Sequence, residues 1–551
     1  MTLRISRRAW LGAAAFAAAG AEPLPSRLVW DQGPLSHLGA PSPDASFLTI
    51  VDAGNLALRR LDSGAVRRLA EAVPASRQFA YFSIVSPDSR RIAYAWHNSQ
   101  GIYELRVIGV EGGQPLTVHR NAERPFVQPC AWSPDGKRIL TLFFRQDNVS
   151  QIAWVGAERG EVQVLSSLDW VYPNKMDLSP DGKWIVFDDL RTDAEGQRTL
   201  FLLAADGSAK RRLLAKPDHD VFPLFARDGK RVYFLRRGEL WSTAVQGGQA
   251  QKLAGLGRAL PLGITTGSTL YYALRRGEPG IFVGAPGQQA ARAGNGNGDP
   301  AWSAGGNRLA FLTRAANENF GIESRFVGVA DSATGQLRIV EPKLAHIDGV
   351  DWLDADTLLV GGSNRHGQRG LFAVAIASGA TKPVISEHAG THLGLTGAKT
   401  AKGVAFSDGA AIRLRNPAGA DSELFRAAEG VSIHHLTASH NGLRLAFAVR
   451  SGATETVFTM GLDGAAPRQA ALLRGGGAIG LGWETDGASL LASIPTDPPS
   501  VWRVFVNGEK PLRLGWNLAQ TGAVRVQPGA GRLAYSSGAA KLEIRAVNCP
   551  E

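Results

Sequence analysis

A short motif recurs along this chain at a nearly constant interval. Its fullest copy is Ser-Pro-Asp-Gly-Lys-Arg-Ile, and the copies begin at Ser42, Ser86, Ser133, Ser179 and Ala226. Successive copies start 44, 47, 46 and 47 residues apart. A fixed period of this size predicts a repeat architecture, in which each unit buries its apolar face against its neighbours.

One unit of the repeat contains four short apolar segments without a helical period. A turn of sequence Ser133-Pro134-Asp135-Gly136 joins the first two segments. Proline presets φ in such a turn, aspartate accepts local backbone hydrogen bonds, and glycine takes the position with positive φ. Four β-rich segments in about 40 residues predict the four strands of one propeller blade. In this unit the segments are residues 127–132, 139–144, 151–155 and 162–165.

The period continues to the carboxyl end with weaker copies. They lie at Trp302, Trp352, Ser439, Trp483 and, most weakly, Gln527. Two gaps of nearly double length each predict one degenerate unit, at 264–291 and 393–426. The total of twelve exceeds the four to eight blades of a single ring. The sequence therefore predicts an all-β fold of two tandem β-propellers, with six blades each or, as the alternative, seven plus five.

The expected domain boundaries follow from this count and from the Gly/Asn-rich stretch Gly294–Pro300, which we interpret as a linker between the rings. The tryptophans that precede the turns, such as Trp132 and Trp352, are expected to pack between neighbouring blades. The predicted segments are an export signal at 1–21, an N-terminal extension at 22–37, a first propeller at 38–293, a linker at 294–300 and a second propeller at 301–551.

The unit resembles the TolB-type, WD-repeat-like propeller repeat. That repeat has an aromatic or apolar residue, Ser-Pro-Asp-Gly, a basic residue and an apolar strand, and residues Trp132 to Ile139 match it best. The resemblance covers nearly all of the chain after about residue 38. It implies a propeller fold and a binding or scaffold protein of the TolB-like class. Because propellers host unrelated activities, the resemblance does not name a ligand.

The first 21 residues have the pattern of an export signal. Basic residues, among them Arg7 and Arg8, precede a short alanine-rich segment at 10–19, and Ala19-Gly20-Ala21 offers a cleavage site. Residues 6–11 resemble the twin-arginine signal. An ordinary secretory signal and a retained membrane anchor stay open as alternatives. Each interpretation predicts an exported protein, either periplasmic or secreted.

Charge and cysteine content limit the classes of partner. The formal net charge is +11, but the basic residues are dispersed, so we expect no nucleic-acid partner. No later segment is apolar over the 18 to 20 residues that a membrane-spanning helix needs, so we expect no transmembrane span in the mature chain. We also expect a monomer. Cys130 and Cys549 are the two cysteines. We expect Cys130 to be buried and Cys549 exposed, with a disulfide between them as the alternative.

The sequence lacks the common catalytic motifs. The chain has no Gly-x-Ser-x-Gly elbow for serine hydrolysis and no Gly-Lys-Ser/Thr phosphate-binding loop. We expect no bound cofactor unless histidines converge on a divalent metal ion. The candidate metal ligands are His346, His388, His392, His434 and His435.

The loops that enter the innermost strands are the expected binding loops, because they lie at a mouth of the central channel. The candidate binding residues are Asp218, His219, Asp220, His346 and Asp348. The leading hypothesis is an exported binding or scaffold protein that recognises a peptide, a protein or a glycan at a channel mouth. The alternative is a metal-dependent lyase or hydrolase acting on anionic carbohydrate, which rests on the histidines and the positive charge.

Overall fold

The structure is a computed structural model, and it describes residues 25–550 apart from a set of short segments. These segments are 32–36, 53, 72–77, 99–101, 125, 146–148, 169–171, 190–197, 216–217, 258, 277–278, 287, 289, 314–325, 345, 365–367, 387–395, 429–430, 452–453, 475–479, 495–499, 517–521 and 539–540. The predicted signal at 1–21 and the candidate ligands His388 and His392 therefore lie outside the described residues.

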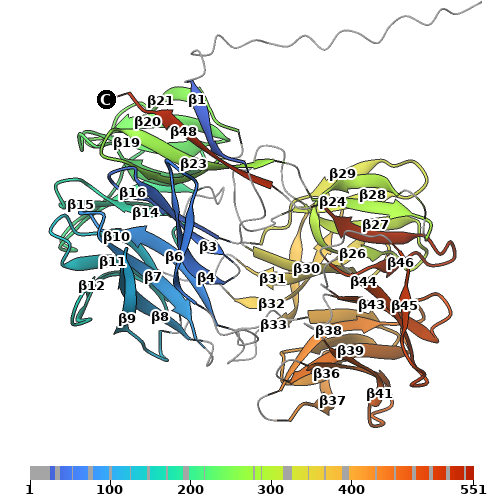
Figure 1. The fold of residues 1–551 in the computed structure, drawn as a ribbon. Helices are drawn as coiled ribbons and strands as arrows, with labels where there is room; N and C mark the ends of the chain where they lie inside the picture. Colours follow the sequence, from blue (N-terminus) through green and yellow to red (C-terminus); the bar gives the residue numbers. More distant parts are fainter. Residues whose placement is uncertain are drawn as a thin grey trace, which may run out of the picture.

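The described residues form twelve four-stranded antiparallel sheets, each of which is one blade. Two groups of blades lie side by side in Figure 1, one mainly blue to green and one mainly yellow to red. Among these residues there is no helix with the length and apolar character needed to cross a membrane. The predicted all-β fold of two propellers is confirmed.

The first propeller has blades 1 to 6. Their strands, from the innermost outward, are β2 (His37–Pro41), β3 (Phe47–Asp52), β4 (Asn55–Arg60) and β5 (Val66–Ala70); β6 (Phe79–Val85), β7 (Arg91–His97), β8 (Tyr103–Gly109) and β9 (Gly112–His119); β10 (Phe126–Trp132), β11 (Arg138–Phe144), β12 (Ser150–Gly156) and β13 (Val162–Leu168); β14 (Met176–Leu178), β15 (Trp184–Asp189), β16 (Thr199–Ala204) and β17 (Lys210–Arg212); β18 (Asp220–Phe225), β19 (Arg231–Arg236), β20 (Glu239–Ala244) and β21 (Gln251–Gly255); and β22 (Ala259–Ile264), β23 (Thr269–Arg276), β48 (Lys541–Asn548) and β1 (Ser26–Trp30).

The second propeller has blades 7 to 12. Their strands, in the same order, are β26 (Asn297–Trp302), β27 (Arg308–Thr313), β28 (Phe326–Asp331) and β29 (Leu337–Val340); β30 (His346–Trp352), β31 (Thr357–Ser363), β32 (Arg369–Ala375) and β33 (Thr381–Ser386); β34 (Thr396–Thr400), β35 (Gly403–Ser407), β36 (Ala411–Arg415) and β37 (Asp421–Arg426); β38 (Ser432–Ala438), β39 (Arg444–Ser451), β40 (Thr454–Gly461) and β41 (Arg468–Arg474); β42 (Gly480–Trp483), β43 (Ser489–Ile494), β44 (Ser500–Phe505) and β45 (Leu512–Leu514); and β46 (Arg525–Val526), β47 (Leu533–Ser537), β24 (Gly280–Gly284) and β25 (Ala291–Asn295).

Contacts between innermost strands close each propeller into a ring. In the first propeller β2, β6, β10, β14, β18 and β22 contact one another in succession, and β22 contacts β2 again. In the second propeller β26, β30, β34, β38, β42 and β46 form the same circuit, and β46 contacts β26. Each ring therefore has six blades around a central channel, as in the six-plus-six prediction.

The two propellers are nested in the chain and do not follow one another. The second propeller, β24 to β47, is inserted between β23 and β48 of blade 6. Strand β48 returns to the first propeller and pairs with both β23 and β1. Figure 1 shows this red strand among the green strands of the first propeller. The expected boundaries at 293 and 301 differ from this arrangement, because the last repeat unit before them is divided between the rings.

The expected linker and N-terminal extension are also parts of blades. The stretch 294–300 lies in β25 and β26 apart from Gly296, which joins the two strands, and Ser26–Trp30 of the expected extension forms β1. The glycines at 294 and 296 serve close packing, since a Cβ at Gly294 would lie 2.5 Å from Phe311 Cζ and one at Gly296 would lie 2.3 Å from the Leu312 carbonyl oxygen. Sequence composition alone does not distinguish such glycines from those of a linker.

The turn of each repeat is built as its residues predict. In blade 3 the Ser133 hydroxyl donates to Asp135 Oδ1 at 2.6 Å and accepts from the backbone N–H of Arg138 at 2.9 Å. Gly136 has a φ of +67°, in the left-handed region. Because this turn follows every clear innermost strand, it sets where that strand ends and where the next one begins.

Tryptophans connect neighbouring blades. The indole N–H of Trp132 donates to the Ile84 carbonyl of the preceding blade at 3.4 Å, and Trp352 does the same to Ala301 at 2.9 Å. Arg91 stacks on the Trp132 ring with its Cζ 4.9 Å from the ring centroid, and it donates to the carbonyl of Gly136 at 2.7 Å. The predicted packing of these tryptophans between blades is confirmed.

Candidate binding site in the channel of the first propeller

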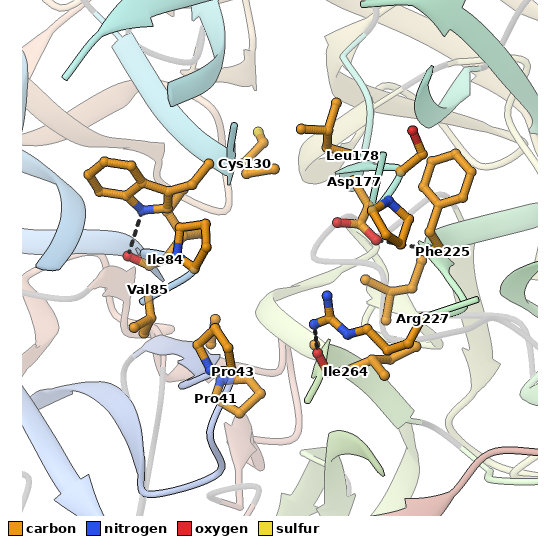
Figure 2. Close-up of a pocket in the computed structure, with 18 of the residues that line it drawn as sticks. Pro41, Pro43, Ile84, Val85, Cys130, Asp177, Leu178, Phe225, Arg227 and Ile264 are labelled. Atoms are coloured by element: carbon orange, nitrogen blue, oxygen red, sulfur yellow. Dashed lines mark hydrogen bonds between the residues drawn. The ribbon is translucent and has the colours of Figure 1, made fainter. Parts of the chain in front are cut away.

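A cavity of about 280 Å³ occupies the channel of the first propeller, and all six blades contribute to its wall (Figure 2). It lies at the end of the channel where the innermost strands run into their turns. The residues that line it are Ala40, Pro41, Pro43, Ile84, Val85, Pro87, Cys130, Ala131, Trp132, Pro134, Lys175, Asp177, Leu178, Ser179, Pro180, Leu224, Phe225, Arg227, Leu262, Gly263, Ile264 and Thr266.

The mouth of this cavity is formed by one equivalent residue from each blade, the second residue of the turn. We call this set the rim, and it consists of Pro43, Pro87, Pro134, Pro180, Arg227 and Thr266. All of the rim residues are exposed except Pro43, which is half-buried. The cavity is therefore open to solvent at the rim, and its edge is mostly apolar.

The wall of the cavity has an apolar side and a charged side. Figure 2 shows Pro41, Pro43, Ile84 and Val85 across the cavity from Asp177 and Arg227. The apolar side comes from blades 1 to 3, whereas the charged side chains come from blades 4 and 5. A cavity divided in this way favours a guest with an apolar part and a charged part.

Asp177 and Lys175, both half-buried, are held in place by backbone groups of other blades. Asp177 Oδ2 accepts from the backbone N–H of Phe225 in blade 5 at 2.8 Å. The Lys175 ammonium donates to the carbonyl of Leu262 in blade 6 at 3.2 Å. Burial raises the pKa of the Asp177 carboxyl and lowers the pKa of the Lys175 ammonium, because the channel removes water from both charges.

Arg227 occupies the rim where four other blades have proline. Its Nε donates to the carbonyl of Thr265 at 3.1 Å, and one Nη donates to the carbonyl of Ile264. No ion pair joins Asp177 to Arg227 or Lys175 within the part of the chain that the structure describes. The charged side therefore carries two cations and one carboxyl group that do not neutralise each other in direct pairs.

The cysteines are both free thiols. Cys130 is half-buried in the cavity wall, and burial raises its pKa to about 12. The expected exposure of Cys549 is wrong, because its residue is 6% exposed. The chain end packs into blade 6, where the backbone N–H of Cys549 donates to the carbonyl of Ser268 at 3.0 Å. A thiol as protonated as that of Cys130 is a poor nucleophile and metal ligand.

The candidate residues Asp218 to Asp220 lie at the opposite end of blade 5 from Arg227. Asp220 begins β18, is fully buried and accepts from Arg236 Nε at 2.7 Å. Asp218 accepts from Arg237 Nη2 at 2.5 Å, and His219 has a φ of +56°. Each aspartate thus pairs with an arginine, Asp220 with Arg236 at the end of β19 and Asp218 with Arg237 in the turn that follows. These pairs are structural. Their part in binding stays a prediction.

The other candidate residues lie in the second propeller. Asp348 is exposed and pairs with Arg369 at 2.8 Å, and the His346 side chain lies outside the described part. In β38, Ser432 Oγ and His434 Nε2 are 2.7 Å apart, and the His434 and His435 rings are 6.1 Å apart. Among the described residues no three His, Cys, Asp or Glu side chains form a cluster that would hold a metal ion. The metal site stays a prediction.

Sequence reasoning missed the charged side of the cavity. A signal for Arg227 was present, since the copy at Ala226 has Ala-Arg in place of Ser-Pro. The signal for Asp177 was a charged residue two positions before the turn. At this position the other five blades of the first propeller have Ala40, Ile84, Ala131, Leu224 and Gly263. Positions where a sequence departs from its own local rules are often functional or strained sites. Neither signal shows which mouth of the channel is open.

Comparisons with known proteins agree with the repeat motif. No protein-family model matches the chain. The chain is 26% identical over 215 residues to an uncharacterized protein of Agrobacterium fabrum, a match that covers 38% of this chain and 68% of that protein. It is 30% identical over 170 residues to the Tol-Pal system protein TolB of Anaeromyxobacter dehalogenans, covering 30% of this chain and 36% of that protein.

The chain thus spans little more than a third of the curated TolB relatives it matches. A solved structure of a putative TolB from Agrobacterium tumefaciens is 23% identical and has a TM-score of 0.35, covering 42% of this chain and 86% of that one. A TM-score this low supports no inference about the function of this chain. The sequence matches and the repeat motif together identify the blades as TolB-like β-propeller repeats.

Proposed function

We propose that this protein is an exported binding protein of the TolB-like class, and that it holds a segment of another protein at the rim of the first propeller. The main evidence for this proposal is the cavity of about 280 Å³, which all six blades line and which opens at the rim. Binding residues concentrate in loops that a rigid scaffold positions, and here the scaffold is a closed ring.

The composition of the rim favours a protein segment over a small substrate. The cavity, at about 280 Å³, is close to the lower end of the roughly 300–1,000 Å³ of small-molecule sites and has room for one or two side chains. The four prolines of the rim are rigid and expose no N–H group, so they offer apolar contact at low entropic cost. A partner would therefore insert a side chain or a chain end and rest its remaining surface on the rim.

The relatives support a role in binding proteins. The relatives from Anaeromyxobacter are named as proteins of the Tol-Pal system, and a system implies components that associate. Export is supported by the arginine-containing signal pattern at the beginning of the chain.

The proposal is tested by selecting displayed random peptides against the purified full chain. We expect enrichment of sequences that bind the wild type and fail to bind Ala131→Phe, because a phenyl ring at this lining position fills the cavity. Val164→Phe is the matched control, since Val164 lies on the outermost strand β13, is 41% exposed and does not line the cavity.

Two results would contradict the proposal. The first is that no sequence is enriched over a surface without protein. The second is that the enriched sequences bind Ala131→Phe as well as they bind the wild type, which would place their site elsewhere on the molecule.

A further inference from the structure

We propose that the cavity of the first propeller takes a carboxylate group of its guest, held by Lys175 and Arg227, with an apolar residue beside it against blades 1 to 3. The carboxylate belongs to a protein segment, either as its chain terminus or as an acidic side chain. This inference rests on the proposed function and names the chemistry that the site selects.

The first argument is where the repeat departs from its own template. Four blades have proline at the rim, and Arg227 replaces it in blade 5. Five blades have an apolar residue two positions before the turn, and Asp177 replaces it in blade 4. Both departures are in neighbouring blades, and both line the same cavity. At the equivalent positions the other blades of the first propeller carry no charged residue.

The second argument is that both cations keep donors for an anion. An ammonium has three N–H groups and a guanidinium has five. Among the described contacts Lys175 uses one of its donors on the Leu262 carbonyl, and Arg227 uses Nε and one Nη on the carbonyls of Thr265 and Ile264. In Figure 2 the guanidinium of Arg227 extends from the wall toward the open centre of the cavity. A carboxylate between the two groups would accept charge-assisted hydrogen bonds.

The third argument is the charge balance of the wall. Lys175 and Arg227 give two positive charges against the single carboxyl of Asp177, so the charged side is positive whether or not Asp177 is ionised. Lys175 is half-buried in the channel wall, and this burial lowers the pKa of its ammonium. A partly buried cation without an ion-pair partner is costly, and an anionic guest would offset that cost.

The fourth argument is the apolar side, which selects a protein segment over a sugar. Pro41, Ile84 and Val85 face the charged side across the cavity and offer no polar side-chain atom. The indole N–H of Trp132 is already used on the Ile84 carbonyl. A sugar would leave its hydroxyl groups unpaired against this side, whereas an aliphatic side chain would bury apolar surface there.

The test uses four small probes with the full chain and measures their affinities by titration calorimetry. Acetyl-Pro-Leu with a free terminal carboxylate represents a chain end, and acetyl-Leu-Asp-Leu amide represents an acidic side chain. Acetyl-Pro-Leu amide and acetyl-Leu-Asn-Leu amide are their neutral counterparts. We expect at least one carboxylate to bind about tenfold or more tightly than its amide, the effect of one charge-assisted contact. The arm that shows the preference identifies the source of the carboxylate.

Two variants assign the preference to the proposed residues. Arg227→Pro restores the residue of four other blades and is expected to fold, and Lys175→Met keeps the length of the side chain without its charge. Each should reduce the preference for carboxylate over amide by about tenfold. Lys252→Met is the control, because Lys252 pairs with Glu239 on the outer strands of blade 5 and does not line the cavity.

The inference is overturned if carboxylates and amides bind equally, if neither binds at about 10 mM, or if the preference survives in both variants. It is also overturned if galacturonate binds more tightly than every peptide probe, which would assign the cavity to anionic carbohydrate. The proposed function has a separate outcome, since peptides selected on the wild type and lost in Ala131→Phe would support it even without any preference for a carboxylate.

Discussion

At the scale of single residues, two aspartates occupy equivalent places in the two propellers. Asp177 lies two residues before Ser179, and Asp351 lies two residues before Leu353, which takes the serine position of its turn. The carboxyl of Asp177 accepts a backbone N–H from the next blade, and the carboxyl of Asp351 has the same kind of contact with Lys399. Each ring thus uses one acidic side chain to connect innermost strands, and each of these carboxyls loses water to the protein.

The pH dependence of stability should reveal Asp351. Burial raises the pKa of its carboxyl to about 6 from a usual 3.8. A raised folded-state pKa means that the stabilising contribution is complete below about pH 4 and is lost as the pH rises through about 6. Asp351→Asn stays neutral at every pH. The free energy of unfolding of the variant minus that of the wild type should therefore increase by up to about 3 kcal/mol from about pH 4 to about pH 7.

The measurement is urea unfolding of both proteins at the two pH values. Comparing the variant with the wild type cancels the titration of all other groups. A stability difference that does not change with pH would show that the Asp351 carboxyl is not held in the protonated form.

At the scale of elements, glycines with the same backbone conformation serve different purposes. Gly136 in the repeat turn has a φ of +67°, while Ala45 and Ser89 take the same place in blades 1 and 2 with φ of +59° and +57°. Gly160 has a φ of +73°, and a Cβ there would lie 1.9 Å from the carbonyl oxygen of Val118 in the neighbouring blade. Residues other than glycine tolerate the positive φ of the repeat turn. They do not tolerate a Cβ that collides with the backbone of a neighbouring blade.

Two substitutions should therefore differ in cost. Gly136→Ser should lower the free energy of unfolding by about 1 kcal/mol, the usual cost of a side chain in the left-handed region. Gly160→Ala should lower it by about 3 kcal/mol, because blades 2 and 3 must also separate locally. Thermal unfolding midpoints of the two variants measure this difference. Equal losses would contradict the close approach of the two blades.

At the scale of the whole molecule, ring closure depends on strands from both ends of the chain. Ser26 pairs with Val547 across β1 and β48, and Leu270 of β23 pairs with the same residue from the other side. Strand β24 leaves for the second propeller directly after β23. The last strand of the chain is therefore an internal strand of the first propeller.

Deleting residues 541–551 should damage the first propeller and spare the second. The deletion removes β48 and leaves β1 without a partner, so amides of β1 and β23 should lose protection from hydrogen exchange. Amides of β27 to β44 should keep it. A tandem arrangement predicts the reverse, so loss of protection confined to blades 7 to 12 would refute the nested topology.

Export is a separate expectation for the whole chain. If residues 1–21 are a twin-arginine signal, replacing Arg7 and Arg8 together by lysine should leave the protein in the cytoplasm of a twin-arginine-competent bacterium. Fractionation with a protein exported by the general secretory route as control measures this. Unchanged export would assign the signal to the general route.

The repeat made the blades predictable, and the limits of that prediction are also physical. Turn residues such as Pro134 and Gly136 act within four residues, so the sequence shows them directly. The pairing of Ser26 with Val547 joins residues at opposite ends of the chain and leaves no local pattern. The same holds for the site. The rim prolines are part of the motif, but the cavity exists only where six distant turns meet. The described candidate histidines, His219, His434 and His435, do not line it.

The account depends most on the claim that a protein segment occupies the cavity at the rim of the first propeller. A crystal structure of the full chain with the most enriched peptide tests this claim directly. We predict electron density for the peptide between Pro134 and Arg227, with an apolar side chain near Val85 and a carboxylate within hydrogen-bond distance of Lys175 or Arg227. Density at the opposite mouth, beside Asp218 and Asp220, or in the second propeller would contradict it.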